Sequence, residues 1–220
     1  MLAMSRLVLD HGYSTEYAAR IIQREDGEQT VMPVPNSLPV YRLRHSRDWL
    51  TEEEVAEVSQ LLMAYRDRRE SLPARVGPAL WNLDYSATVR WIDIRLPLLV
   101  IAFEGLISTS TDLVRRQFIS RVPQVADDAG AEGISEAFCR RMYDARSRWA
   151  HGAHLALKPE PKTEPQPDDS SAEAADEEVA PVVLMESALR RVIRRCIEDE
   201  AFSDHFDTDD SVRAQWPVTI

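Results

Sequence analysis

Arg146 and His151 form the pair of residues in this sequence whose types best suit cleavage of a phosphodiester bond. They lie five positions apart in the run YDARSRWAHG, residues 143–152. A histidine can take the proton of a ribose 2′-hydroxyl or give one to the leaving oxygen, since its pKa lies near the working pH. An arginine can hold the scissile phosphate and stabilise its developing charge. This pair indicates RNA cleavage that needs no metal.

The spacing of this pair is weak evidence without its context. About half an Arg-x4-His match is expected by chance in a chain of this composition, and Arg6 and His11 show the same spacing. Five residues turn a helix by about 500°, so Arg146 and His151 lie about 140° apart on an unbroken helix. Either the helix loosens near Gly152, or a second copy of the chain completes the site.

Other catalytic and metal-binding patterns are missing from the sequence. It has seven glycines, no Gly-rich phosphate loop and no Gly-x-Ser-x-Gly elbow. His151 and His154 have no carboxylate or cysteine at ligand spacing, and Cys139 and Cys196 are too few for a cysteine-rich zinc site or a disulfide framework. We therefore expect no metal, no cofactor and reduced thiols.

The composition limits the class of protein. The 220 residues include 26 basic and 37 acidic side chains, a net charge of −11 that excludes a strongly basic nucleic-acid binder of the histone type. Arginine outnumbers lysine 24 to 2, so the positive charge comes as planar groups that bind phosphate bidentately. The longest apolar run, residues 96–103, is far short of the about 20 residues of a membrane span. With no signal peptide visible, we expect a cytoplasmic protein that does not associate with membranes.

Apolar spacing predicts five helices. Thr51 and Glu54 form a capping box that starts the first helix, and Pro73 and Pro78 end it. Residues 85–108 are the most apolar and should form the central helix, kinked or restarted at Pro97. A third helix follows a cap in residues 109–112, and the later ones begin near Ser135 and residue 181. Short loops favour antiparallel neighbours, so we expect an all-α, up-and-down helical bundle.

The chain divides into five segments by pattern and composition. An Asp26-Gly27 pair between short β-prone runs predicts a hairpin near the start. Four prolines and eight acids make residues 158–180 too polar to bury a core, which predicts disorder. The expected segments are an arm with a β-hairpin (1–48), a helical bundle (49–157), an acidic linker (158–180), the last bundle helix with a short C-terminal helix (181–208) and a tail (209–220).

The run YDARSRWAHG at the end of an amphipathic helix resembles the signature of the HEPN superfamily, in particular its Apea-like branch. Residues 91–108 are similar to the central helix of that branch, whose end is matched here by AFEGL (102–106). Residues 115–122 and 50–69 are similar to its next and first helices. The resemblance covers about residues 50–156 and the helix at 181–200, without the arm or the linker.

The resemblance implies a HEPN-like bundle that dimerises, with the Arg-x4-His motifs of two protomers lining a shared cleft. Many such domains are metal-independent endoribonucleases in phage-defence or toxin–antitoxin systems, which implies an antitoxin or defence-system partner. Others have lost activity and serve as RNA-binding or dimerisation modules. By resemblance, Arg146 and His151 are the catalytic pair, Ser147 is the polar residue after the arginine, and Glu104 is the recurrent acid of the central helix.

Each of these residues also has an ordinary structural interpretation. Arg146 can be a salt-bridge residue, and His151 can be a C-terminal residue favoured by the helix dipole. Glu104 lies in an apolar helix, which favours a structural partnership with an arginine over acid catalysis. Further arginines can guide RNA or form a solvated surface: Arg115, Arg116, Arg121 and Arg148.

Four more arginines cluster on the last bundle helix: Arg190, Arg191, Arg194 and Arg195. They can bind phosphate, or they can hold the acidic residues at 198–210 or the acidic linker, and covalent proximity favours the contact with acids. Three classes of function thus stand together: an endoribonuclease, a non-catalytic HEPN module that binds RNA or dimerises, and a general helical scaffold.

Overall fold

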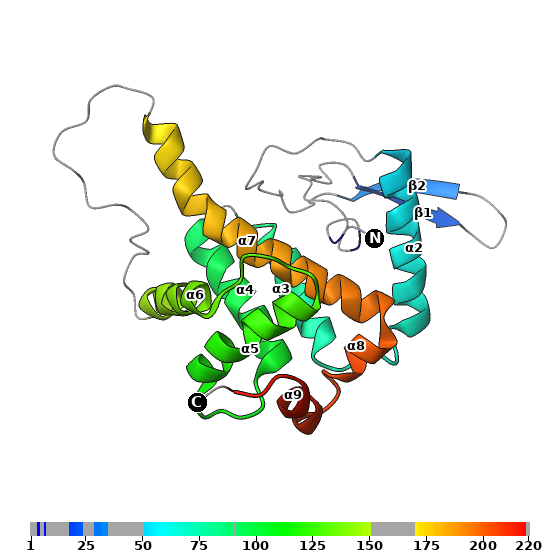
Figure 1. Cartoon of the computed structure of the whole chain (residues 1–220). Coiled ribbons are helices and arrows are strands. Elements are labelled where there is room, and N and C mark those ends of the chain that lie inside the picture. The colour runs from blue at the N-terminus through cyan, green and yellow to red at the C-terminus, as the bar shows by residue number, and fades with distance from the viewer. Residues whose placement is uncertain are drawn as a thin grey trace.

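The structure, a computed structural model, describes residues 51–89, 91–150 and 170–218, together with Met4, Leu7 and two strands. For the strands and for residues 170–179 the backbone alone is described. The helices in the described residues (Figure 1) are α2 (Glu52–Arg68), α3 (Val76–Ser86), α4 (Ile92–Ile107), α5 (Val114–Asp128), α6 (Glu136–Ala150), α7 (Ser170–Glu198), α8 (Glu200–Asp204) and α9 (Asp209–Gln215). The body of the protein is therefore all-helical, as the sequence predicts.

Strands β1 (Ala18–Gln23) and β2 (Gln29–Val34) pair antiparallel. Ala18 lies opposite Val34 and Gln23 opposite Gln29. The residues that connect the two strands, including the Asp-Gly pair, lie outside the described part of the chain. Met4 and Leu7 belong to the buried core of the helical body.

Helix α4 is the centre of the helical body. Leu96, Leu99 and Phe103 are fully buried, and α4 contacts α3, α5, α6 and α7. The Phe103 ring meets Phe118 of α5 edge to face, with ring centroids 6.5 Å apart. This agrees with an apolar stripe that covers most of the helix circumference. Side chains outside this stripe, such as Glu104, can therefore contact other polar groups near the surface.

The first and fourth expected helices begin where their capping residues predict. The Thr51 hydroxyl accepts from the Glu54 amide, and the Glu54 carboxylate accepts from the Thr51 amide, which completes a capping box. The Ser135 hydroxyl accepts from the amide of Phe138 at the start of α6. The cap expected in residues 109–112 is not used in this way. Helix α5 instead follows Leu113, whose φ of 57° is left-handed.

Helix α3 lies where the sequence predicted an end to the first helix. Pro78 is only the third residue of α3, a position whose backbone N–H has no intrahelical acceptor, so a proline is tolerated there. The helix expected at 85–108 accordingly starts at Ile92. Pro97 lies in its second turn, and α4 continues through it to Ile107. The prolines punctuate this region less strongly than the sequence suggests.

Helix α7 begins at Ser170, within the segment predicted to be a disordered linker (158–180). Residues 172–178 consist of alanine and acidic residues, which are good helix formers or favour the first turns through the helix dipole. Residues 158–169 lie outside the described part of the chain. Val182 is fully buried, so the packed part of α7 starts close to the predicted residue 181.

Residues 209–218, the described part of the predicted tail at 209–220, are instead part of the fold. They include α9, and Trp216 is 1% exposed. The Trp216 ring packs against Phe202 and Phe206, and its indole N–H donates to the Asp128 carboxylate at 2.7 Å. Sequence periodicity missed this element because it has only seven residues.

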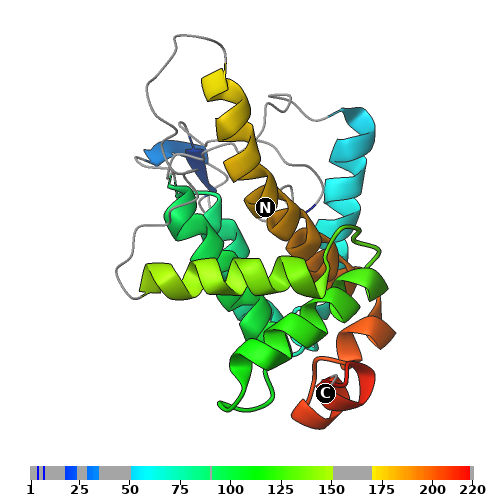
Figure 2. The same cartoon turned by 60° about the vertical axis from the view of Figure 1, so that its left-hand side comes forward.

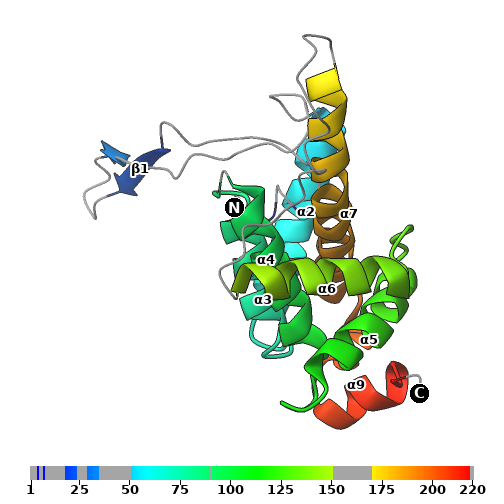
Figure 3. The same cartoon turned by 90° about the vertical axis from the view of Figure 1, so that its left-hand side faces the viewer.

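Helix α6 lies across the other long helices. In Figures 2 and 3 it runs across the direction of α4 and α7. In an up-and-down bundle it would instead lie alongside them. It contacts both α4 and α5. The residues that connect α5 to α6 include two glycines with positive φ, Gly130 and Gly133, which allow the chain to turn between them. This arrangement brings the middle of α6 against the side of α4 that carries Glu104.

Candidate functional site

An ion pair joins α4 to α6 at the position of the expected site. Nη2 of Arg146 lies 3.4 Å from Oε2 of Glu104, with side chains 29% and 14% exposed. The Arg146 guanidinium also lies over the Tyr143 ring, 5.7 Å from its centroid. The favoured interpretation of Glu104, as the partner of an arginine, is confirmed. The arginine in question is the proposed catalytic one.

Tyr143 completes this group, which we call the Glu104 cluster (Glu104, Tyr143 and Arg146). Tyr143 and Arg146 are three residues apart, so both side chains extend from the same side of α6. Burial raises the pKa of the Tyr143 hydroxyl, and the charge of Glu104 and a hydrogen bond to it raise that pKa further. The hydroxyl therefore stays protonated at neutral pH and donates to the carboxylate. Phe118 fixes the ring from the other side, at 5.4 Å between centroids.

The arrangement leaves part of the Arg146 guanidinium able to bind an anion. A guanidinium has five N–H donors, and the contact with Glu104 at 3.4 Å engages one nitrogen. A phosphate at the open side would meet donors that Glu104 and Tyr143 hold in place. The carboxylate also offsets the charge of the arginine, so the cluster combines a well-oriented donor with reduced net charge.

His151 lies outside the described residues. Helix α6 ends at Ala150, the residue immediately before it. The structure therefore does not describe the distance between the Arg146 and His151 side chains, and their pairing remains a prediction. Arg6 and His11, which share the spacing, also lie outside the described residues.

Three of the four arginines expected to contact RNA are exposed on α5 and α6. Arg115 makes a two-nitrogen contact with the Asp144 carboxylate, at 3.0 and 2.9 Å, with both side chains about half exposed. Arg116 and Arg148 are exposed, and Ser147 is half-buried. Arg148 follows Asp144 by one turn of α6, so it extends toward the same side as the contact with Arg115.

Arg121 is not a surface residue, so the expectation that it could contact RNA is wrong. Its side chain is 3% exposed. The guanidinium donates to the carbonyl oxygens of Ile107 and Trp216, both at 2.8 Å, and to the Gln117 side chain at 2.7 Å. Burial lowers the pKa of Arg121, and the nearby charges of Arg213 and Arg75 lower it further. Arg121 is a structural residue that ties α5 to α4 and to the segment after α9.

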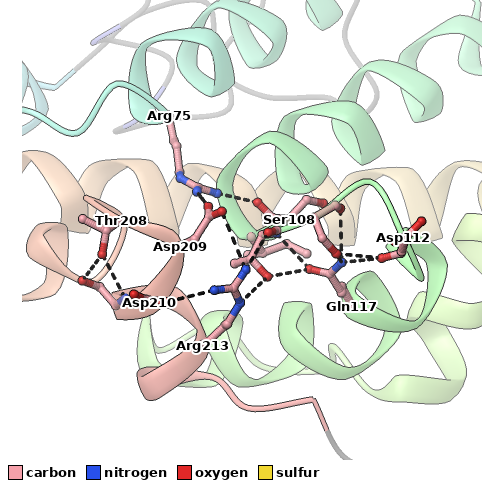
Figure 4. Close-up of polar contacts among 12 residues, drawn as sticks. Arg75, Ser108, Asp112, Gln117, Thr208, Asp209, Asp210 and Arg213 are labelled. Atoms are coloured by element: carbon pink, nitrogen blue, oxygen red, sulfur yellow. Dashed lines mark hydrogen bonds and ion pairs between the residues drawn. The ribbon is translucent and has the colours of Figure 1, made fainter.

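Arg121 belongs to a larger polar network at the C-terminal end of α4. Figure 4 shows the part of it around Arg75, Ser108, Asp209 and Arg213. Arg75 donates to the Ser108 carbonyl at 2.6 Å and forms an ion pair with Asp209. Arg213 donates to the Thr109 carbonyl at 2.8 Å. The last carbonyls of a helix have no intrahelical donors, and here Arg121 and Arg75 supply donors to the carbonyls of Ile107 and the C-cap Ser108. Arg213 of α9 serves the carbonyl of the next residue, Thr109. We call this group the α4-end network.

The arginines of α7 mostly contact acidic side chains. Arg194 pairs with Glu57 and Glu198, and Arg195 pairs with Asp199. For these two, the expected contact with the acids that follow α7 is confirmed. Arg190 pairs with Glu186, Arg191 donates to the Gly130 carbonyl, and all four arginines line a cavity of about 450 Å³.

Metal-binding groups and reactive thiols were also sought among the described residues. They hold no group of three or more His, Cys, Asp or Glu side chains that could bind a metal ion. Burial raises the pKa of the Cys139 thiol to about 12 and also raises that of Cys196, so neither is a thiolate nucleophile at neutral pH. No helix in this part of the chain has the length and apolar composition to cross a bilayer.

Sequence reasoning missed Tyr143 and Asp144 as site residues. Both lie inside the run quoted for the motif, and the spacing of Tyr143 to Arg146 could have indicated contact on one side of a helix. The α4-end network gave no comparable signal. Arg213 and Thr109 are 104 positions apart, and local spacing carries no information about such contacts.

Comparison with known proteins found no relative of this chain. The chain matches no protein-family model, no curated protein and no solved structure. The resemblance to HEPN proteins therefore depends on the residues themselves, chiefly the run around Arg146 and the acid at 104.

Proposed function

We propose that the protein is a metal-independent endoribonuclease of the HEPN type, acting as a toxin or phage-defence component. Two copies of the chain would line one cleft with Arg146 and His151. The observation that carries the proposal is the Glu104 cluster: Arg146 is held by Glu104 at 3.4 Å over Tyr143, yet remains 29% exposed. An arginine oriented in this way can bind a phosphate and stabilise its transition state.

The proposed reaction is an attack of the ribose 2′-oxygen on the neighbouring phosphorus. An imidazole of His151 takes the 2′-hydroxyl proton as the new P–O bond forms, and the bond to the 5′-oxygen breaks. A protonated imidazole returns a proton to that 5′-oxygen. The products are a 2′,3′-cyclic phosphate and a 5′-hydroxyl end. No water molecule needs activation, so the chemistry requires no metal or cofactor.

The exposed arginines beside the cluster would contact the RNA backbone. Arg115, Arg116 and Arg148 lie on the exposed sides of α5 and α6, which contact one another. Planar guanidinium groups match phosphate geometry. Glu104 acts as a positioning residue that orients Arg146, and Ser147 supports the site from the adjacent position on α6.

A second candidate is a HEPN module that binds RNA or dimerises without cleaving. The observation that favours it is the same ion pair, because the Glu104 carboxylate offsets the charge with which Arg146 would stabilise a transition state. In that case RNA contacts at Arg115, Arg116 and Arg148 would remain, and no cleavage would follow. The two candidates differ in one measurable property, the appearance of RNA fragments.

The test is incubation of the purified protein with mixed RNA in EDTA. Cleavage is expected, and EDTA should leave it unchanged because the proposed chemistry uses no metal. His151→Ala should lower the rate by about 10²–10⁴ while RNA binding largely survives, since the imidazole moves protons. Arg146→Ala should reduce both binding and cleavage, because its guanidinium contacts phosphate in the ground and transition states.

Two controls make the test specific. His11→Ala should retain activity, since Arg6 and His11 share the spacing outside the bundle. Arg141→Ala removes an exposed arginine of α6 that contacts Phe138 rather than Glu104, and it should also remain active. Wild-type protein that leaves RNA intact, or a His151→Ala variant as active as wild type, would remove the nuclease proposal in favour of the second candidate.

A further inference from the structure

None of the exposed residues of α3 and α4 is charged, and the acidic residues Asp84, Asp93 and Glu104 of these helices are half-buried. We call the following set the uncharged face: Gly77, Pro78, Trp81, Tyr85, Trp91, Ile94, Ile101 and Gly105. In α5, by contrast, every exposed residue is charged: Arg115, Arg116, Asp127 and Asp128. The chain contains 29% charged residues. Two adjacent helices whose exposed residues are all uncharged are therefore typical of a surface that contacts another molecule.

The uncharged face is also rich in aromatic area. Trp81 is 63% exposed and stacks in parallel on Tyr85, with ring centroids 5.2 Å apart, and Trp91 is 65% exposed. Since one aromatic side chain buries about 150–250 Å², the face offers on the order of 500 Å² of apolar area. This approaches the ~800 Å² that each partner contributes to a standard protein interface, and aromatic residues are enriched in such interfaces.

The geometry of the face permits close approach by another backbone. Ile94, Ile101 and Gly105 recur at seven and four residues, so they lie along one side of α4. A Cβ atom added at Gly77 or Gly105 would meet nothing within 4 Å. Helices α3 and α4 lie side by side (Figure 3). Two adjacent helices whose exposed residues are uncharged, with glycine among them, can pack against a second pair.

The uncharged face borders the candidate site. Gly105 directly follows Glu104, which pairs with Arg146 of α6. Trp149, one turn beyond Arg146, is 38% exposed near the end of α6. A partner seated on α4 would therefore lie next to the Glu104 cluster and to the C-terminal end of α6.

We propose that the uncharged face is the surface through which two copies of this chain associate. A chain with a net charge of −11 repels its own copy, so two copies meet most favourably where neither presents a charge. RNA is a poor fit to this surface, because its phosphates need cations and the face has none. The inference rests on the proposed function in one respect: the association would bring together the two α6 ends that a shared cleft requires.

Measurement of molar mass by light scattering and sedimentation, over a range of concentrations, tests this proposal on the full chain. Wild-type protein should be a dimer. Ile101→Glu and Trp81→Glu each place a carboxylate on the face, and each should raise the dimer dissociation constant by about 100-fold or more. Both positions are well exposed in the single chain, at 40% and 63%, so far-UV circular dichroism should show unchanged folding. The matched control is Val55→Glu, 49% exposed on α2 and outside the face, which should remain a dimer.

Each contrary result has a definite meaning. A wild-type chain that stays monomeric at all concentrations overturns the proposal, as does an Ile101→Glu variant that dimerises like wild type. A monomer whose cross-linking to RNA is lost in Trp81→Glu would assign the face to RNA instead. Dimerisation without RNA cleavage leaves this inference standing and removes the proposed function. RNA cleavage by a chain that stays monomeric overturns this inference and the shared cleft, and leaves only the cleavage chemistry of the proposed function.

Discussion

The buried charge of Arg95 is neutralised by a carboxylate from a distant part of the chain. Arg95 of α4 lies 3.0 Å from the Glu186 carboxylate of α7, with side chains only 2% and 4% exposed. Glu186 also pairs with Arg190, one turn later on α7. One carboxylate therefore serves two arginines, and the two sides of this small network should respond differently to mutation.

Glu186→Ala should lower the free energy of unfolding by about 3–5 kcal/mol, because it leaves the buried Arg95 guanidinium without its carboxylate. Arg95→Met should cost less, since Glu186 keeps Arg190 and methionine fills much of the space. Urea denaturation of both variants measures the difference. Equal losses for the two variants would show that the carboxylate is not shared in this way.

Cys139 should make stability depend on pH in the alkaline range. Burial raises the pKa of its thiol from 9.0 to about 12 in the folded chain. Between these values the unfolded thiol ionises while the folded thiol stays neutral, so ionisation favours the unfolded chain. The contribution is fully present below pH 9 and is lost as the pH rises toward 12. Wild type should therefore lose stability more steeply than Cys139→Ala between pH 9 and 12, as measured by urea denaturation at several pH values.

At the residue scale, the sequence predicted the contacts that local chemistry determines. A carboxylate in an apolar helix requires a partner, and Glu104 has Arg146. Arg121 shows the limit of such reasoning, because its charge suggested exposure while its guanidinium serves carbonyls on two other segments. Whether an arginine contacts solvent or a buried helix end depends on tertiary position, which spacing does not encode.

At the element scale, the C-terminal end of α4 depends on residues from three other parts of the chain. Arg75, Arg121 and Arg213 donate to the carbonyls of Ser108, Ile107 and Thr109. Figure 4 shows Arg75 and Arg213 on either side of Asp209. Helix α9 therefore holds the segment that leaves α4, although the two are far apart in sequence. The segment that looks like a tail should contribute strongly to stability.

Deletion of residues 209–220 should lower the melting temperature by about 10 °C or more. It removes Trp216, whose loss from a core alone costs about 3–5 kcal/mol, together with the Arg213 contact. The control is deletion of residues 160–178, which ends before Val182, the first fully buried side chain described in α7. That deletion should shift the melting temperature little, as the acidic, proline-rich composition predicts. Differential scanning calorimetry compares the two, and a larger loss for the second would contradict this assignment.

The helices that the sequence predicted well are those with a strong cap and a clear apolar stripe. The Thr51 capping box and Ser135 mark their helix starts correctly. Helix α3 was missed because Pro78 suggested an end, and α9 because seven residues show too little periodicity. The transverse position of α6 follows from packing on α4 and α5, which loop length alone could not predict.

At the scale of the whole molecule, charge separates the two interactions proposed for this chain. The protein carries −11 overall, yet Arg115, Arg116 and Arg148 are exposed on α5 and α6, and its uncharged face lies on α3 and α4. Association of two acidic chains is opposed by long-range repulsion, which salt screens. Binding of RNA depends on arginine–phosphate contacts, which salt weakens.

Raising the salt concentration from 50 to 200 mM should therefore act in opposite directions on the two interactions. The dimer should tighten, as measured by sedimentation, while RNA affinity should fall, as measured by a filter-binding or polarisation assay. Ile101→Glu should change the first salt dependence and leave the second. Dimerisation that weakens with salt would instead indicate ion pairs across the interface.

The α4-end network can form completely only when synthesis of the chain is almost finished. Arg213 follows Thr109 by 104 residues, and ribosomes add about 5–20 residues per second. The carbonyl of Thr109, just after the most apolar helix, thus lacks its Arg213 donor for about 5–20 seconds while the rest of the chain is being made. Glu104 lies one turn before the end of α4, so the candidate site would reach its final geometry only after α9 has been translated. For a nuclease, this delay would keep a half-made chain inactive while it is still beside the messenger and ribosomal RNA that produce it.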